Sequence, residues 1–487
     1  MFLLLSTVSA ILAIWYLKFL WGRRKMYIHS WNTPGPFAFP LVGCSYLFLS
    51  DLQGANRRVI ELLRLYPGLM RLWLGPYLIY IPTKPEYVQK LLNNVLEKQE
   101  TIRYNDYPGR TGLIAASVKV WKRHRKMIMP TFSQKILNSF MDKFNEKAQI
   151  LCKQMDEHVG QKNVDFYDMI SKCTLDIICE TAMGIGMNTQ TIPSDYDSSM
   201  NRLIELICLR AMNVRYHIEF IWKLSSAGKS WKKPYEICRN FTSNVIKKKI
   251  EEHTCNSKET VVETRRTEPF LDYLVKTESF TEQELCDEVN TVLAAGTETS
   301  ARTVLSMMMA LGVYQDIQEK VYEEVMEVLG PDRQVEPQDI SRMKYTDRAV
   351  KETLRIFPTA PVTVRTVETD LRLDEKYLIP EGSIIFILLT ALHRDPNYWP
   401  DPFKFDPDRF LPENIAKRHA GSYLPFMSGP RNCIGGGFAI MSIITIIAHL
   451  TRKYRFFTEY KTLEEIEVLP LLSLKLVNGS KLWIERR

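Results

Sequence analysis

The sequence predicts a predominantly helical protein with a small β region, an α+β fold in which one large domain follows an N-terminal apolar helix. Apolar residues recur at three- and four-residue spacing, the period of amphipathic helices, in the runs 86–98, 119–129, 134–158, 165–182, 282–316 and 436–452. Short β-branched and aromatic runs bounded by proline and glycine predict strands near 69–82 and 371–390. The charged run 246–268 lacks a period and predicts a helix end followed by an exposed loop.

Composition is that of a globular chain. Hydrophobic residues make up 45% of the 487 residues and charged residues 25%, which excludes a largely disordered or fibrous protein. The net charge of +8 suits an acidic partner, an anionic membrane or a nucleic acid equally, so it selects none of them. The nine cysteines are odd in number and irregularly spaced, with no CxxC pair, which predicts reduced thiols and no zinc site of the usual spacing.

The N-terminus, residues 1–22, predicts a transmembrane signal anchor. Phe2 to Trp21 carries one charge, Lys18, and as a helix would span about 30 Å, the thickness of a bilayer core. A cleaved signal peptide is the alternative, but it would place basic residues before the apolar run, whereas Arg23, Arg24 and Lys25 follow it. The positive-inside rule then places the rest of the chain in the cytosol.

Residues 23–45 combine this basic cluster with a segment rich in proline and glycine. Proline fixes φ and glycine permits unusual turns, so Thr33 to Pro36, Pro40 and Gly43 predict a stiff hinge, with an ordinary linker as the alternative. No repeat or composition break divides the chain after it, so residues 46–487 are predicted to form a single domain.

The strongest local signal surrounds Cys433. Phe426, Gly429, Arg431, Cys433 and Gly435 lie within ten residues, just before the apolar run that starts at 436. A helix N-terminus and a nearby arginine both favour thiolate. A buried structural cysteine is the alternative, but five fixed residue types in such a window recur by chance only about once in several million windows.

These residues match the haem-binding loop FxxGxRxCxG, and the chain resembles the cytochrome P450 family over nearly its whole length. Glu352 to Arg355 matches the family's ExxR motif and Phe405 to Phe410 its PxRF segment. Ala295 to Ser300 matches the oxygen-activating run and Trp121 to Arg125 the WxxxR motif. The motifs other than the cysteine loop are weak individually, but all five occur in the family's order and spacing.

The resemblance implies a haem-enclosing domain that holds haem b through the Cys433 thiolate as the axial iron ligand. It also implies that the propionates are bound by Trp121, Arg125, Arg365 and Arg431, and that Phe426, Gly435, Ala295 and Gly296 adjoin the haem. Glu352 and Arg355 share one helix face and are expected to form a buried salt-bridge network with Arg409, which supports folding around the haem.

The oxygen-activating run lies inside a long predicted helix. Glycine in a helix interior costs about 1 kcal/mol, and threonine can bond back to the preceding turn. We therefore expect a local opening at Gly296, with Thr299 handling bound oxygen and Glu298 relaying protons inward as the catalytic pair. A small-residue face for close helix packing is the alternative.

Two segments, 287–291 and 432–435, resemble the microsomal family-4 clan, especially its insect branches. Many fatty-acid ω-hydroxylases of that clan carry a glutamate, ester-linked to the haem, where this sequence has Ala295. The resemblance therefore implies haem that is bound without a covalent link, and it gives no ground for strict ω-hydroxylation.

Electrons are expected from another protein because no flavin or nicotinamide signature follows the haem region. The family and the anchor imply NADPH–cytochrome P450 reductase, with cytochrome b5 as a second candidate, at the cytosolic face of the endoplasmic reticulum membrane. Lys122, Arg123 and Lys126 could form a basic docking face, or simply a solvated one. No nucleic-acid partner is expected.

Three functions are compatible with a haem-thiolate protein of this kind. The leading one is a monooxygenase that hydroxylates or epoxidises a lipophilic substrate, such as a fatty acid, a hormone-like lipid or a xenobiotic. The alternative is an isomerase or dehydratase that acts on a lipid peroxide without a reductase, and Glu298 with Thr299 argues against it. A haem carrier or sensor is disfavoured because the complete activation set is present.

Overall fold

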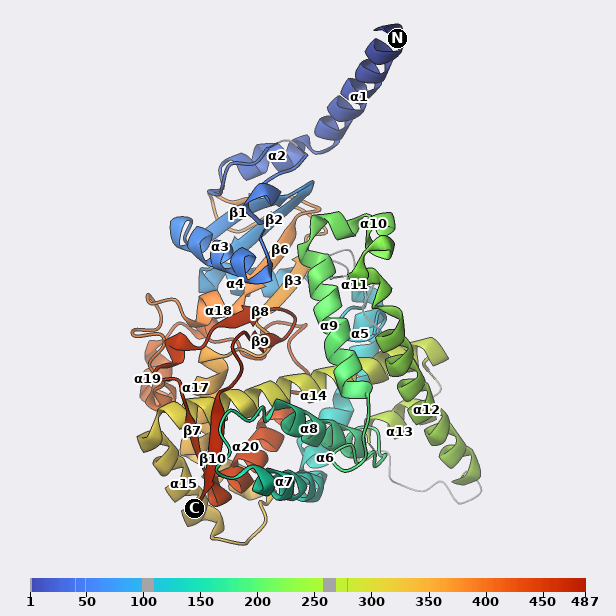
Figure 1. The fold of residues 1–487 in the computed structure, drawn as a ribbon. Helices are drawn as coiled ribbons and strands as arrows, with labels where there is room; N and C mark the ends of the chain where they lie inside the picture. Colours follow the sequence, from blue (N-terminus) through green and yellow to red (C-terminus); the bar gives the residue numbers. More distant parts are fainter. Residues whose placement is uncertain (1, 40, 49, 99–108, 257–268, 278) are drawn as a thin grey trace. The chain divides into compact units, whose positions relative to one another are not determined.

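The computed structural model describes residues 2–39, 41–48, 50–98, 109–256, 269–277 and 279–487. The chain forms two compact units, Met1–Glu97 with Val364–Ile387, and Lys98–Thr363 with Leu388–Arg487. Helices dominate and strands are few and short (Figure 1), which confirms the predicted helical fold with a small β region.

The first unit is built around a four-stranded sheet of order β1-β2-β6-β3. β1 and β2 form an antiparallel hairpin with Leu69 opposite Pro82, whereas β2 and β6 run parallel with Ile79 opposite Ile384. β4 and β5 form a separate antiparallel pair. The elements are α1 (Phe2–Gly22), α2 (Arg24–Trp31), α3 (Leu52–Leu65), β1 (Leu69–Leu74), β2 (Tyr77–Pro82), α4 (Pro85–Asn94), β3 (Val362–Thr366), β4 (Leu371–Arg372), β5 (Leu378–Ile379) and β6 (Ile384–Leu388).

The N-terminal residues of this unit are helical. α1 covers the apolar run and α2 begins in the basic cluster. Among the described residues, none of the helices has both the length and the apolar character that crossing a membrane requires.

The segment predicted as a hinge lies along β1. The Arg71 N–H donates to the Pro34 carbonyl at 2.8 Å, and the Cys44 N–H donates to the Trp73 carbonyl at 2.6 Å. Gly43 adopts φ +62°, and a Cβ there would lie 2.3 Å from the Trp73 carbonyl oxygen. Only glycine therefore fits this approach of the segment to the strand.

The second unit is organised around α14 (Glu282–Val313), a helix of 32 residues that packs against α8 (Tyr167–Thr181) and α20 (Gly436–Lys453) (Figure 1). A capping box formed by Thr281 and Glu284 begins it. Most of its residues are buried, as expected for a helix that packs around nearly its whole circumference.

The remaining helices of the second unit are mostly short. They are α5 (Val118–Ile128), α6 (Gln134–Ser139), α7 (Met141–Met155), α9 (Tyr196–Met212), α10 (Glu219–Leu224), α11 (Ser226–Lys229), α12 (Lys232–Asn256), α13 (Phe270–Thr277), α15 (Gln315–Leu329), α16 (Pro337–Arg342), α17 (Lys344–Ile356), α18 (Leu389–His393) and α19 (Pro412–Lys417). Its strands form two antiparallel pairs, β7 (Tyr454–Thr458) with β10 (Leu482–Arg486) and β8 (Val468–Pro470) with β9 (Leu474–Leu476).

One predicted helix is divided in the structure. The helix predicted over 134–158 is wrong as one element, because α6 ends and α7 begins at Phe140, whose N–H bonds three residues back to Leu137. The apolar period continues through both helices, so it does not reveal the break. The run 371–390 contains three short strands, as predicted for that region, and the end of the predicted charged loop, 257–268, lies outside the described residues.

We expect Gly43→Ala to destabilise the first unit. Positive φ costs a non-glycine residue about 1–2 kcal/mol, and overlap with the Trp73 carbonyl adds about 1–3 kcal/mol. Gly68→Ala is the matched control, since Gly68 has φ +88° but its Cβ would meet only the flexible Lys84 side chain at 3.2 Å. Thermal unfolding midpoints of the two variants check this, and equal losses would contradict it.

Candidate functional site

The Cys433 loop closes on itself just before α20. The Cys433 N–H donates to the Phe426 carbonyl at 2.9 Å, and the Asn432 N–H donates to the Gly429 carbonyl at 3.2 Å. Met427 and Gly429 both take positive φ, 61° and 75°, which gives the tight turn. α20 starts at Gly436, so the thiol lies directly before a helix N-terminus.

Cys433 is an exposed residue although protein atoms surround its thiol. The residue is exposed, yet burial raises the pKa of its thiol, while the Gly435 N–H and the Arg125 charge oppose that rise. Both observations hold if the sulfur faces a space inside the protein rather than bulk water. A thiolate there has cationic and N–H support and an open side for a ligand.

Cationic and aromatic side chains adjoin this loop. Arg125 donates through Nη1 to the Asn432 carbonyl at 2.7 Å, and Arg431 donates through Nη2 to the Ala116 carbonyl at 2.5 Å. The two guanidinium groups lie 5.9 and 5.2 Å from the Trp121 ring centre. The structure therefore brings Trp121, Arg125 and Arg431 together beside Cys433.

The charge on Arg125 lacks an acidic counterpart. Its guanidinium is half-buried, and no carboxylate in the described part of the chain forms an ion pair with it. Burial lowers the pKa of Arg125, and Cys433 opposes this. An exposed cysteine beside a partly buried cation and a buried Trp121 matches the donor set that a metalloporphyrin with carboxylate side chains requires.

Arg365 belongs to the other unit. It lies on β3, is 1% exposed, and donates through Nη1 to the Val364 carbonyl at 2.9 Å. Its predicted place beside the haem stays a prediction. Phe426 and Gly435 are both half-buried within the loop described above.

The network predicted for Glu352, Arg355 and Arg409 is present. Arg355 donates to Glu352 twice, through Nε at 2.7 Å and Nη2 at 2.8 Å, and both side chains are 0% exposed. Arg409 Nε lies 3.4 Å from Glu352 Oε1, and the Asp406 N–H donates to the same oxygen at 3.0 Å. Burial raises the pKa of Glu352, and the Arg355 hydrogen bonds and charge oppose this.

On α14, three residues of the predicted oxygen run share an open stripe. Ala295, Gly296 and Thr299 are half-buried within a helix whose neighbouring residues are buried, and the Thr299 hydroxyl donates to the Ala295 carbonyl at 2.7 Å. The expected opening at Gly296 is wrong, because α14 is α-helical throughout. Gly296 instead allows close packing, since a Cβ there would lie 2.8 Å from Ile178 Cδ1 on α8.

Glu298 lies away from this stripe. Its buried carboxylate accepts from Arg302 Nε at 2.9 Å, from Ser473 Oγ at 2.8 Å and from the Tyr167 hydroxyl. Arg302 lies one turn along the same helix and could be found from the sequence by its spacing. Tyr167 and Ser473 come from distant segments, and no local pattern reveals them.

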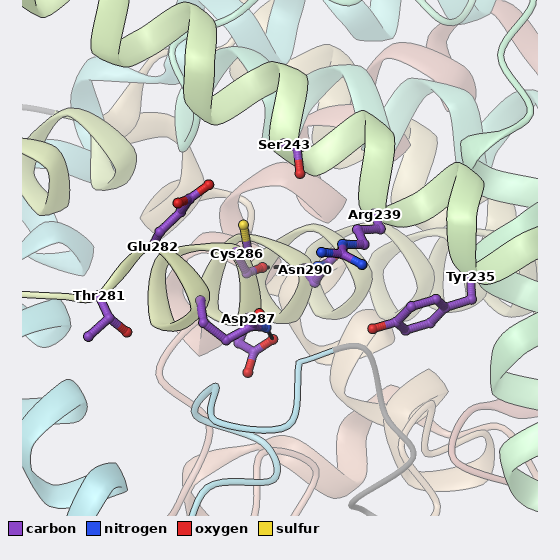
Figure 2. Close-up of a pocket in the computed structure, with 9 residues that line it drawn as sticks. Tyr235, Arg239, Ser243, Thr281, Glu282, Cys286, Asp287 and Asn290 are labelled. Atoms are coloured by element: carbon purple, nitrogen blue, oxygen red, sulfur yellow. Dashed lines mark hydrogen bonds between the residues drawn. The ribbon is translucent and has the colours of Figure 1, made fainter.

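A separate polar cavity of about 410 Å³ lies between α12 and the N-terminal part of α14. Figure 2 shows Arg239 and Ser243 of α12 facing Cys286 and Asn290 of α14. Cys286 and Ala295 are about 2.5 helical turns apart and so face opposite sides of α14. The cavity is therefore not the space beside Thr299.

All three residues predicted to form a basic face on α5 are exposed, and one of them is paired with a carboxylate. Lys122 and Lys126 are exposed, as a docking face requires. Arg123 is also exposed but forms an ion pair with Glu284 of α14, so part of its charge is neutralised within the protein.

The comparisons with known proteins agree with this geometry. The family model described as cytochrome P450 matches residues 33–480. Cytochrome P450 4V2 from Homo sapiens is 31% identical over 96% of this chain and 92% of its own length. Cytochrome P450 4c21 from Blattella germanica is 32% identical over 88% of each chain. The solved heme domain of a cytochrome P450DA mutant shares the fold, with a TM-score of 0.77 at 22% identity over 93% of this chain and 98% of its own.

We expect Glu352→Gln to destabilise the second unit by about 3–5 kcal/mol, because it leaves the buried Arg355 charge uncompensated. Asp408→Asn is the control, since Asp408 pairs with Arg348 at the surface with 54% of its side chain exposed. Such a pair contributes about 0–1 kcal/mol. Unfolding midpoints measured side by side check this, and similar losses in both variants would contradict it.

Proposed function

The chain belongs to the cytochrome P450 family and is family-4-like. It is a haem-thiolate monooxygenase whose haem b is bound through a cysteine thiolate, and we propose that this cysteine is Cys433. The observation that carries this assignment is the exposed Cys433 directly before α20, next to Arg125. Among the other cysteines whose side chains the structure describes, Cys286 is half-buried in the cavity between α12 and α14, and the rest are buried: Cys44, Cys152, Cys173, Cys179, Cys208 and Cys238.

The residues around the loop fit the haem. Arg125 and Arg431 supply cations and Trp121 an indole N–H for the propionates, and Arg365 is proposed as a further cation. Phe426 and Gly435 would adjoin the macrocycle on the cysteine side, Ala295 and Gly296 on the α14 side. Ala295 presents no carboxylate with which a haem ester could form, so the haem is held without a covalent link.

The haem supplies oxygen activation when bound, and its thiolate ligand favours O–O cleavage. The chain's own residues on α14 would supply protons beside the bound haem. Thr299 presents its hydroxyl on the open stripe of α14. Glu298, the adjacent carboxylate, is proposed as the acid that resupplies it.

Electrons are proposed to come from NADPH–cytochrome P450 reductase, with cytochrome b5 as a second donor. The supporting observation is that Lys122 and Lys126 are exposed on α5, the helix that also carries Trp121 and Arg125. A basic surface here would attract an acidic partner and orient it toward the haem.

A membrane location is proposed from the first residues of the chain. The apolar α1 and the following Arg23, Arg24 and Lys25 suit an anchor in the endoplasmic reticulum membrane, with the rest of the chain on the cytosolic face. The substrate would then be a lipophilic molecule that partitions from the bilayer, such as a fatty acid, a hormone-like lipid or a xenobiotic.

One observation favours the alternative function, an isomerase or dehydratase. Glu298 is held by three partners away from Thr299, and an isomerase or dehydratase acting on a lipid peroxide needs no proton relay. The requirement for a reductase separates this alternative from the monooxygenase.

We expect Cys433→His to remove the red-shifted Soret band that the reduced carbon monoxide complex shows when a thiolate binds the iron, because imidazole donates less electron density. Cys286→Ser should keep that band, since Cys286 lies in the separate cavity between α12 and α14. An unchanged spectrum in Cys433→His would show that another residue is the ligand.

We expect Thr299→Ala to keep haem binding but to release more hydrogen peroxide for each NADPH oxidised. The reason is that a positioned hydroxyl contributes about 10²–10⁴-fold to proton transfer. Thr303→Ala is the matched control, since Thr303 makes the same type of back-bond one turn further along α14, to the Thr299 carbonyl at 2.8 Å. Peroxide released per NADPH is the measurement. If Thr299→Ala releases no more peroxide per NADPH than the parent, and the protein rapidly rearranges an organic hydroperoxide without reductase, the isomerase is favoured.

A further inference from the structure

One residue of the Cys433 loop holds Arg125 of α5 at two points. Arg125 donates through Nη1 to the Asn432 carbonyl at 2.7 Å and through Nη2 to the Asn432 side-chain oxygen at 2.5 Å. The two oxygens of Asn432 thus receive the two arms of the guanidinium as the oxygens of a carboxylate would. Unlike a carboxylate, this pair of acceptors carries no charge.

The loop returns the contact to α5. Arg431 donates through Nη2 to the carbonyl of Ala116, just before α5 begins. The Trp121 ring centre lies 5.9 Å from the Arg125 guanidinium and 5.2 Å from that of Arg431. Each element therefore places an arginine on the backbone of the other, which restricts where both guanidinium groups can lie beside the loop.

This arrangement leaves the Arg125 charge uncompensated within the protein. Its two bonds to Asn432 end on neutral oxygens, and no carboxylate in the described ranges of the chain forms an ion pair with it. A guanidinium has more N–H groups than the two that Asn432 accepts, so donors remain for another acceptor. A haem propionate and a bound Cys433 thiolate are the anions that this site is proposed to hold.

An acidic residue at position 432 would hold Arg125 more strongly, since a charged acceptor makes the stronger hydrogen bond. It would also cancel most of the charge of the cation before the haem binds. The amide of Asn432 holds the guanidinium in place without cancelling its charge.

We propose that Asn432 is a positioning residue for Arg125, which it holds beside the Cys433 loop without neutralising it, so that one cation serves both a haem propionate and the thiolate. This inference rests on the proposed binding of haem through Cys433. It adds that Asn432 acts through Arg125, so that the residue directly before the iron ligand fixes the cation on α5.

The first measurement is haem release, followed as transfer of haem from the reconstituted full chain to excess apomyoglobin. Asn432→Leu keeps the size of the side chain and the main-chain bond to Arg125, but it removes the side-chain acceptor. We expect release to become about tenfold faster, the lower end of what a hydrogen bond to a charged group contributes. An unchanged release rate in Asn432→Leu would overturn the proposal.

A double-mutant cycle tests whether Asn432 acts through Arg125. Arg125→Ala should also speed release, and adding Asn432→Leu to it should change nothing further, because the partner is gone. If the two effects add, Asn432 acts independently of Arg125 and the proposal is overturned. Arg125→Lys, which keeps the charge but cannot bridge both oxygens, gives the same test if Arg125→Ala takes up no haem.

The reduction potential of the bound haem separates positioning of a charge from a merely structural contact. Asn432→Asp keeps both oxygens for Arg125 but cancels its charge, whereas Asn432→Leu keeps the charge and loses one oxygen. Reduction adds an electron to the iron, so removing a nearby positive charge disfavours it. We expect the potential of Asn432→Asp to fall below that of Asn432→Leu. A structural contact predicts the reverse order, because aspartate preserves the geometry, and that order or equal potentials would overturn the proposal.

Asn138→Asp is the matched control. Asn138 of α6 also accepts a hydrogen bond at its amide oxygen, from Gln134 Nε2 at 2.8 Å in an exposed position, and the variant adds the same charge. It should keep the release rate and the reduction potential of the parent. A fall in potential equal to that of Asn432→Asp would assign the effect to net charge and overturn the proposal.

Failure of the proposed haem site and failure of this inference give different results. If Arg125→Ala takes up haem and keeps the release rate of the parent, Arg125 does not bind a propionate and that part of the proposed site is wrong. If Arg125→Ala speeds release while Asn432→Leu and Asn432→Asp keep the parent values, the site stands and the role of Asn432 is wrong.

Discussion

The stability of the second unit depends on partners for carboxylates that are buried away from water. Three glutamates on α14 and α17 are 0–5% exposed. Two of them pair with an arginine, Glu298 with Arg302 at 2.9 Å and Glu352 with Arg355 at 2.7 Å, and Glu288 is hydrogen-bonded to His124 at 2.7 Å. Breaking such a pair leaves a buried charge, which costs far more than the pair contributes at a surface. These carboxylates therefore restrict where the neighbouring elements can lie.

The pair formed by His124 and Glu288 extends this constraint to α5, which contacts the Cys433 loop. His124 lies on α5 between Trp121 and Arg125, and its Nδ1 bonds to a carboxylate on α14. The residues beside Cys433 are thereby fixed to the helix that carries Thr299. One buried contact thus connects the side of the site that would hold the propionates with the side that would handle oxygen.

The sequence predicts those parts of the site whose residues are close along the chain. Glu352 and Arg355 are three positions apart, so the helix period suffices to pair them, and the Cys433 loop spans ten residues that are identified by their resemblance to a known haem-binding loop. The two hydroxyl partners of Glu298 lie 131 and 175 positions away, and only the tertiary fold brings them together. The same limit explains Gly296, because the sequence shows a helix-weakening glycine but does not show that the Ile178 side chain of α8 packs against it.

The separation of these partners has a consequence for biosynthesis. Tyr167 is made well before Glu298, whereas Ser473 and the β8–β9 pair are made well after it. A nascent chain that has reached α14 therefore holds a carboxylate in an unfinished core, without one of its two hydroxyl donors. Closing the core before residue 473 has been made would bury that carboxylate without its Ser473 donor, at a cost of about 1–3 kcal/mol, so we expect packing around α14 to be completed only after that segment is available.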